Sequence, residues 1–125
     1  MSYSIDYLKQ IIPIANPSKG EAEIRQFILD TALGFKNLDL ETHVDEIGNL
    51  LIRVKGKKSE TAKIAFCAHL DSVPPCEGIT FEEVTDPIDG LIIRPTSETI
   101  LGTDDKSGIA VILALLKRMS EETSE

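Results

Sequence analysis

The feature that most constrains the fold is a run of five apolar residues, IAFCA at 64–68, which is followed directly by His69. The residues before the run are mostly polar, and two prolines follow it at 74 and 75. A continuous apolar run is typical of a strand that is buried on both faces. We therefore predict a central strand at 64–68 with helices packed on both of its faces.

Three helices are predicted around this strand. Apolar residues 5, 8, 11 and 12 recur at helical spacing, and Pro13 ends that first helix. The pattern Ser-x-x-Glu at 18–21 is typical of a capping box and predicts a second helix over 21–33, which would end at Gly34. The strongly apolar segment 109–119 predicts a third helix, whose polar end at 120–125 is expected to fray.

The remaining segments predict short strands. Alternating residues indicate a strand at 38–44, paired antiparallel with 50–54 through a turn at 45–49, before a polar connection at 55–63. A second hairpin is predicted from 80–85 and 91–94. This order of elements predicts an α/β unit with a mixed β-sheet flanked by helices. We expect the 125 residues to form one domain or part of one, with no second domain.

Composition and charge exclude several classes of function. The net charge of -8 disfavours binding to nucleic acid or to an anionic membrane. No apolar run approaches the ~20 residues of a membrane span, and the first residues do not have the pattern of a secretory signal. Two cysteines are too few for a disulfide framework or a zinc ribbon. We expect a cytoplasmic protein, and its oligomeric state stays open.

Two polar residues follow the predicted central strand. His69 and Asp71 are two positions apart, so on an extended chain both side chains face the same side. Ligands of open α/β sheets bind beyond the carboxyl ends of strands, and a metal-bound imidazole usually donates its other N–H to an oxygen. His69 is therefore a candidate metal ligand that Asp71 would orient. The alternative is a structural histidine, with Asp71 starting the turn at 74–75.

A second polar motif, GTDDKSG at 102–108, precedes the third predicted helix. One carboxylate, of Asp104 or Asp105, is explained as the N-cap of that helix. A phosphate-binding loop would need glycine directly before Lys-Ser, where this chain has Asp105. Two adjacent carboxylates suit a cation better, so the motif predicts either a metal ligand or a capped helix alone.

Taken together, these motifs resemble the aminoacylase, carboxypeptidase G and peptidase T family of co-catalytic zinc hydrolases. The pattern AHLDSVPP at 68–75, followed by LGTDDKSGIA at 101–110, is especially similar to the peptidase T branch. The stretch DEIGNL at 45–50 also resembles the family's Asp-x-x-Gly-Asn turn. The resemblance covers nearly the whole chain. It implies that residues 1–125 are the N-terminal part of a zinc peptidase catalytic domain with a phosphorylase/hydrolase-like fold.

The resemblance also implies roles for individual residues. His69 would bind one zinc ion, and Asp71 would be the catalytic residue that orients it. Asp104 would bridge two zinc ions, and the peptide bond between Asp104 and Asp105 would be cis. Lys106 would be structural and would pair with a carboxylate. Cobalt and manganese are alternatives to zinc.

The implied activity is zinc-dependent release of an N-terminal residue from a short peptide, as in a tripeptide aminopeptidase. Two metal ions would polarise the peptide carbonyl and generate hydroxide from bound water. The family's Glu-Glu pair, a later acidic ligand and a distant histidine are not supplied by this chain, so we expect the chain alone to be inactive. The alternatives are an amidohydrolase or deacylase on the same scaffold, and a non-catalytic fold that binds a partner.

Five other residues have side chains that could act in a site, but we expect none of them to have a functional role. Glu121 and Glu122 lie at the end of the third predicted helix and are expected to be solvated carboxylates rather than the general base. His43 is expected on the surface of a strand. Cys67 is expected to be buried and inert in the central strand, and Cys76 to be an exposed free thiol.

Overall fold

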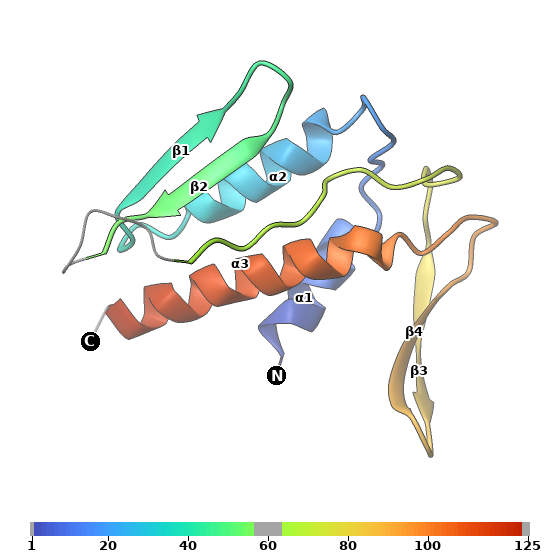
Figure 1. Cartoon of the computed structure of the whole chain (residues 1–125). Helices are drawn as coiled ribbons and strands as arrows, with labels where there is room; N and C mark the ends of the chain where they lie inside the picture. The colour runs from blue at the N-terminus through green and yellow to red at the C-terminus, as the bar shows by residue number, and fades with distance from the viewer. Residues whose placement is uncertain (1, 57–63, 124–125) are drawn as a thin grey trace.

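The computed structural model describes residues 2–56 and 64–123, and the longest helix in that part of the chain begins within the GTDDKSG motif. Figure 1 shows this helix crossing a shorter one, with a third helix beneath a hairpin of strands. The helices are α1 (Tyr3–Ile11), α2 (Ala22–Leu33) and α3 (Thr103–Thr123). The strands are β1 (Leu40–Val44), β2 (Leu50–Val54), β3 (Phe81–Asp86) and β4 (Gly90–Pro95).

Helix α3 carries the centre of the hydrophobic core. Its apolar residues recur every three or four positions, which places them on one face. Ile109, Leu113 and Leu116 on this face are buried, and they form one cluster with Ile11 of α1 and Ile24 of α2. The apolar segment at 109–119 is therefore helical and faces the core, as the sequence predicts.

The strands form two separate two-stranded antiparallel sheets. Strand β1 pairs with β2, and β3 pairs with β4, in registers that run from Leu40↔Val54 and from Phe81↔Pro95. The first hairpin packs on α2, whereas Figure 1 shows the second projecting away from the helices. Both predicted hairpins are confirmed, and so is the α/β class. The predicted mixed sheet is not formed by the described residues.

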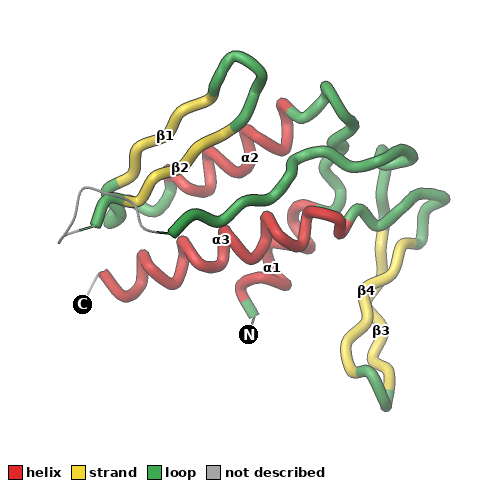
Figure 2. Tube along the Cα trace, viewed as in Figure 1, coloured by secondary structure: helices red, strands yellow, loops and turns green. Residues whose placement is uncertain are grey.

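The segment 64–68, predicted as a central buried strand, is extended but pairs with no strand in the described part of the chain. Ile64 is 75% exposed and Phe66 is 65% exposed. The chain packs against the core only where it reaches Ala68 and Leu70, and Figure 2 draws the whole stretch as loop. The prediction was wrong because burial on both faces requires two neighbouring strands and two covering layers, and residues 2–56 and 64–123 do not provide them.

The start of α2 differs from the predicted capping box. Glu21 is the N-cap residue, but its side chain accepts a hydrogen bond from the backbone N–H of Lys19 at 2.9 Å. The hydroxyl of Ser18 does not cap the helix, because it donates to Asp71. The predicted end of the helix is confirmed, since Gly34 is its C-cap residue.

The predicted fraying at 120–125 concerns the end of α3, of which residues 124–125 lie outside the described residues. The helix continues to Thr123, and Asn37 holds its last turn through contacts with the backbone oxygen of Ser120 and the hydroxyl of Thr123. The hydroxyl of Tyr3 donates to Glu121 at 2.6 Å. Side chains from the start of the chain and from the loop before β1 therefore contact the helix over 120–123, a segment that the polar sequence predicted to fray.

The end of α1, the predicted polar connection and the search for membrane-spanning helices complete the comparison with the sequence. Helix α1 ends at Ile11, before Pro13, as predicted. Most of the predicted polar connection at 55–63 lies outside the described residues, which stop at 56 and resume at 64. No helix within 2–56 and 64–123 has the length and apolar character that crossing a membrane requires.

Candidate metal centre

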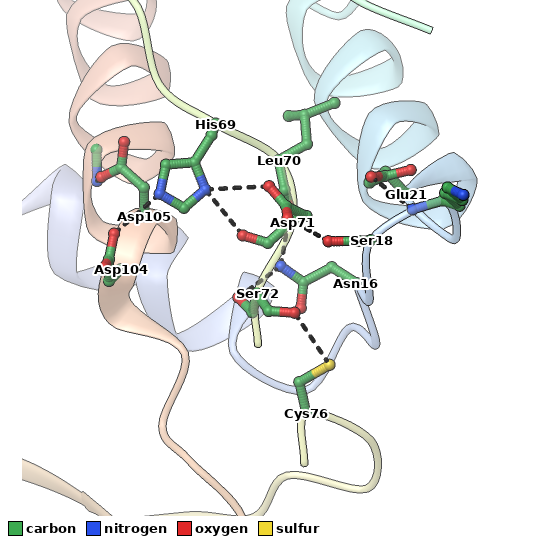
Figure 3. Close-up of polar contacts among 12 residues, drawn as sticks. Asn16, Ser18, Glu21, His69, Leu70, Asp71, Ser72, Cys76, Asp104 and Asp105 are labelled. Carbon is green, nitrogen blue, oxygen red and sulfur yellow. Dashed lines mark hydrogen bonds and ion pairs between the residues drawn. The ribbon is translucent and has the colours of Figure 1, made fainter. Parts of the chain in front are cut away.

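The side chains of His69 and Asp104 meet where the extended segment approaches the start of α3 (Figure 3). Nε2 of His69 lies 2.9 Å from Oδ1 of Asp104, although the residues are 35 positions apart. Both side chains are open to solvent, with 52% of His69 and 95% of Asp104 exposed. The structure thus brings together the two residues predicted as metal ligands, and their role as ligands stays a prediction.

Asp71 lies beside the other nitrogen of the imidazole ring. Nδ1 of His69 is 2.9 Å from the backbone oxygen of Asp71 and 3.3 Å from its Oδ1. Both oxygens are acceptors, so Nδ1 carries a proton and donates it. A metal-binding histidine usually has this arrangement, with one N–H held by an oxygen and the other nitrogen turned to the metal. The position of Asp71 is compatible with the orienting role predicted for it.

The two carboxylates at the start of α3 have different surroundings. The peptide bond between Asp104 and Asp105 is cis, as the family resemblance implies. Oδ1 of Asp105 accepts a hydrogen bond from the backbone N–H of Gly108 at 3.1 Å. A methyl group on Gly108 would lie 2.3 Å from that oxygen, so the missing side chain makes room for the cap. Asp105 is therefore the capping carboxylate, and Asp104 is left to face His69.

Hydrogen bonds shift the pKa values of His69 and Asp71. The hydrogen bond to Asp104 raises the pKa of His69 above its ordinary value and so favours the imidazolium. The hydroxyl of Ser18 donates to Oδ2 of Asp71 at 2.5 Å and lowers the pKa of that carboxyl. In the imidazolium both ring nitrogens of His69 donate, so a cation could bind Nε2 only after that proton has left.

A buried asparagine, which the sequence analysis did not identify, holds the segment that carries His69. Nδ2 of Asn16 donates to the backbone oxygen of Leu70 at 2.8 Å and to the hydroxyl of Ser72 at 2.9 Å. The backbone N–H of Ser72 in turn donates to the backbone oxygen of Asn16 at 2.8 Å. The sequence signal that could have identified Asn16 is its place as a lone amide in the mostly apolar stretch 11–17.

Lys106 is buried, and among the described residues its ammonium bonds backbone carbonyls instead of the carboxylate that was predicted. Its Nζ donates to the backbone oxygens of Ile12 and Ile14 at 2.8 and 2.7 Å. These carbonyls belong to the end of α1 and the residues that follow it, where the helix dipole is negative and favours a cation. Burial lowers the pKa of Lys106 to about 8.

The other candidates lie apart from this centre. Glu121 and Glu122 are on the last turn of α3, and His43 is exposed on β1 as expected. The expected exposure was wrong for both cysteines, although both are free thiols. Cys67 is exposed because the predicted central strand is uncovered, whereas Cys76 is buried with its Sγ 3.7 Å from the backbone oxygen of Ser72.

The donor atoms present match zinc only in part. An imidazole nitrogen and a carboxylate oxygen are common zinc ligands, but zinc usually takes four ligands. No group of three or more histidine, cysteine, aspartate or glutamate side chains is placed to hold a metal ion within residues 2–56 and 64–123. His69 and Asp104 therefore supply at most half of the ligands of a zinc site.

Comparison with known proteins gives distant relatives. No family model matches the chain. The uncharacterized protein YqjE of Bacillus subtilis is 30% identical in an alignment 124 positions long, which covers 93% of this chain and 31% of that protein. A protein of Pyrococcus furiosus named as a LysW-lysine/LysW-ornithine hydrolase is 30% identical over 70 residues, which is 56% of this chain and 20% of that protein. A Thermococcus kodakarensis protein of the same name is 27% identical over 79 residues, covering 63% of this chain and 21% of that protein.

A solved structure matches the fold. The crystal structure of a tripeptidase from Staphylococcus aureus superposes with a TM-score of 0.79 at 21% sequence identity. The match covers 96% of this chain and 32% of the tripeptidase, so this chain spans about a third of that protein and less than a third of the relatives above. The chain therefore has the fold of part of a tripeptidase and is distantly similar to part of the LysW-lysine/LysW-ornithine hydrolases.

Proposed function

We propose that this chain is the N-terminal part of a zinc-dependent peptidase in which His69 and Asp104 are metal ligands and Asp71 orients His69. The observation that carries the proposal is the 2.9 Å separation of Nε2 and Oδ1 on two solvent-open side chains. Asp104 is not needed to cap α3, because Oδ1 of Asp105 accepts the capping hydrogen bond. The fold shared with part of a tripeptidase supports a short peptide as the substrate.

Hydrolysis of another amide is a second candidate function. It is supported by the two archaeal relatives named as LysW-lysine/LysW-ornithine hydrolases, which match the chain over 70 and 79 residues. The same metal chemistry serves both reactions, since in each a metal ion polarises a carbonyl and activates water. Residues that would form the substrate pocket distinguish the two functions, and His69, Asp71 and Asp104 are common to both proposals.

Zinc titration of the purified 125-residue chain tests the metal site. We expect weak binding that shifts the imidazole signals of His69 in NMR spectra, and binding about tenfold weaker or more in His69→Ala and in Asp104→Asn. His43→Ala is the matched control, because His43 is the second of the two histidines and lies exposed on β1. Equal loss of binding in the control, or zinc signals that do not depend on His69, would contradict the proposed ligands.

A peptidase assay tests the prediction that the 125-residue chain alone is inactive. With excess zinc and a tripeptide, we expect no release of amino acid from the chain alone. Residues 2–56 and 64–123 bring only two of the predicted ligands together, and Glu121 and Glu122 lie at the opposite end of α3 from them. Removal of a general base typically lowers a rate by about 10²–10⁴-fold. Turnover that disappears in His69→Ala would instead show that the 125 residues form a complete enzyme.

A further inference from the structure

We propose that residues 12–18, the first part of the loop between α1 and α2 and called the connector here, set the distance between His69 and Asp104, with Asn16 and Lys106 as the positioning residues. This inference rests on the proposed metal site, since it names the residues that hold its two ligands in place. The connector forms one set of hydrogen bonds with the segment that carries His69 and a second, separate set with the start of α3, which carries Asp104.

The first set holds the segment that carries His69. Asn16 is fully buried, and its Nδ2 reaches Leu70 and Ser72, the residues on either side of Asp71. Ser18, two residues after Asn16, donates to the carboxylate of Asp71. The connector therefore fixes the backbone next to His69 and also the carboxylate that lies beside its Nδ1, as Figure 3 shows.

The second set holds the start of α3. Lys106 comes two residues after Asp104, and its fully buried ammonium donates to two carbonyls of the connector, those of Ile12 and Ile14. Its flexible side chain passes beside Gly102, where a Cβ would lie 3.5 Å from both Cδ and Nζ of Lys106. The position of Asp104 relative to the connector is thus set by an ammonium group two residues away.

The burial of polar groups also points to a positioning role. Asn16, Ser72 and Lys106 are the polar or charged residues that are buried within 2–56 and 64–123, and all three belong to these contacts. Oδ1 of Asn16 is buried without a hydrogen-bond partner in that part of the chain. A buried polar atom without a partner lowers the stability of the fold. The two hydrogen bonds that Nδ2 donates to the segment of His69 therefore come with a cost that an apolar residue at 16 would not have.

The experiment compares Lys106→Met and Asn16→Ala with Lys9→Met in the 125-residue chain. Lys9 lies on α1 and pairs with Glu83 at 3.2 Å, so its variant makes the same chemical change outside the connector. NMR at fixed pH reports the imidazole signals of His69, with His43 as internal control, and circular dichroism reports the helices. Zinc affinity is read from the same spectra.

We expect the signals of His69 to move in Lys106→Met and Asn16→Ala while those of His43 stay in place. Zinc affinity should fall by about 10–100-fold, the usual effect of losing a group that positions a metal ligand, and Lys9→Met should match the original chain. Unchanged signals and affinity in both variants would overturn the proposal. If one variant loses its helical signal the other decides, and if both unfold the two residues serve the fold as a whole and the proposal fails.

The outcomes separate this inference from the proposed function. If the original chain binds no zinc through His69, the proposed metal site fails. The spectra of the metal-free variants would still show whether Asn16 and Lys106 position His69 against Asp104. If zinc binds through His69 and Asp104 but the variants bind it equally well, the metal site stands and the positioning role is wrong.

Discussion

Replacing Gly108 by alanine separates the role of Asp105 from that of Asp104. A Cβ at 108 would lie 2.3 Å from Oδ1 and 2.8 Å from Cγ of Asp105. Real structures essentially never contain contacts this short, so the carboxylate has to leave its place above the N–H of Gly108. Alanine in a helix is favoured over glycine by about 1 kcal/mol, and loss of an N-cap costs typically about 1 kcal/mol.

In the original chain the gain from alanine in the helix and the loss of the Asp105 cap nearly cancel. In a chain that already carries Asp105→Ala they do not, because there is no cap to lose. We expect Gly108→Ala to change the free energy of unfolding little, or to lower it, when Asp105 is present. Without the Asp105 side chain no clash remains and no cap is left to lose, so the same substitution should stabilise by about 1 kcal/mol. The two substitutions should therefore show a coupling energy of about 1 kcal/mol or more.

Urea unfolding followed by circular dichroism measures this cycle on the original chain, the two single variants and the double variant. In thermal unfolding, a difference of about 1 kcal/mol corresponds to a difference in Tm of about 4 °C for a chain of this size. The slope of the free energy against urea concentration should stay constant, which shows that the variants unfold from similarly compact states. If Gly108→Ala stabilises equally with and without Asp105, then Asp105 is not the cap and the division of roles between the two carboxylates is wrong.

Three other outcomes follow from the contacts described above. Gly48 has a φ of +95°, and a Cβ there would lie 2.9 Å from Nη1 of Arg25, so Gly48→Ala should lower the free energy of unfolding by about 1–2 kcal/mol in urea titrations. Leu113 is fully buried in the core, and Leu113→Ala should lower it by about 2–5 kcal/mol. The pKa of His69 is raised, so NMR should show His69 titrating above its ordinary 6.5 and returning toward that value in Asp104→Asn. The stability from this pair is present below pH 6.5 and is lost as pH rises through the folded-state pKa.

Features determined by neighbouring residues were predictable from the sequence. Helix α1 ends before Pro13 and α2 ends at Gly34 because proline and glycine act on the local backbone. Both hairpins were predictable because alternation and turn residues lie within each hairpin. The proximity of His69 and Asp104 was implied by the family resemblance, which assigned both residues to one zinc site, although the strand expected to carry His69 is not formed.

Features determined by distant residues were not predictable. The pattern at 18–21 fits a capping box, but Ser18 bonds Asp71 instead, and that partner is 53 positions away. Lys106 was expected near a carboxylate, and its partners are carbonyls 92 and 94 positions earlier. The burial of Cys67 depended on neighbours that the predicted central strand lacks. In each case the sequence identified a polar or apolar group correctly but could not specify which group would contact it.

Lys106 illustrates why stability alone does not account for the residues around the site. Burial lowers its pKa from 10.5 to about 8, so the charged form is disfavoured in the folded chain by roughly 3 kcal/mol. That cost is present in full below pH 8 and disappears as pH rises toward 10.5, where the unfolded chain also loses the proton. An apolar side chain at 106 would avoid this cost but would take the donor away from the carbonyl oxygens of Ile12 and Ile14. The lysine is better explained by what its ammonium joins, the end of α1 and the start of α3 next to Asp104, because functional sites often retain groups that lower the stability of the fold.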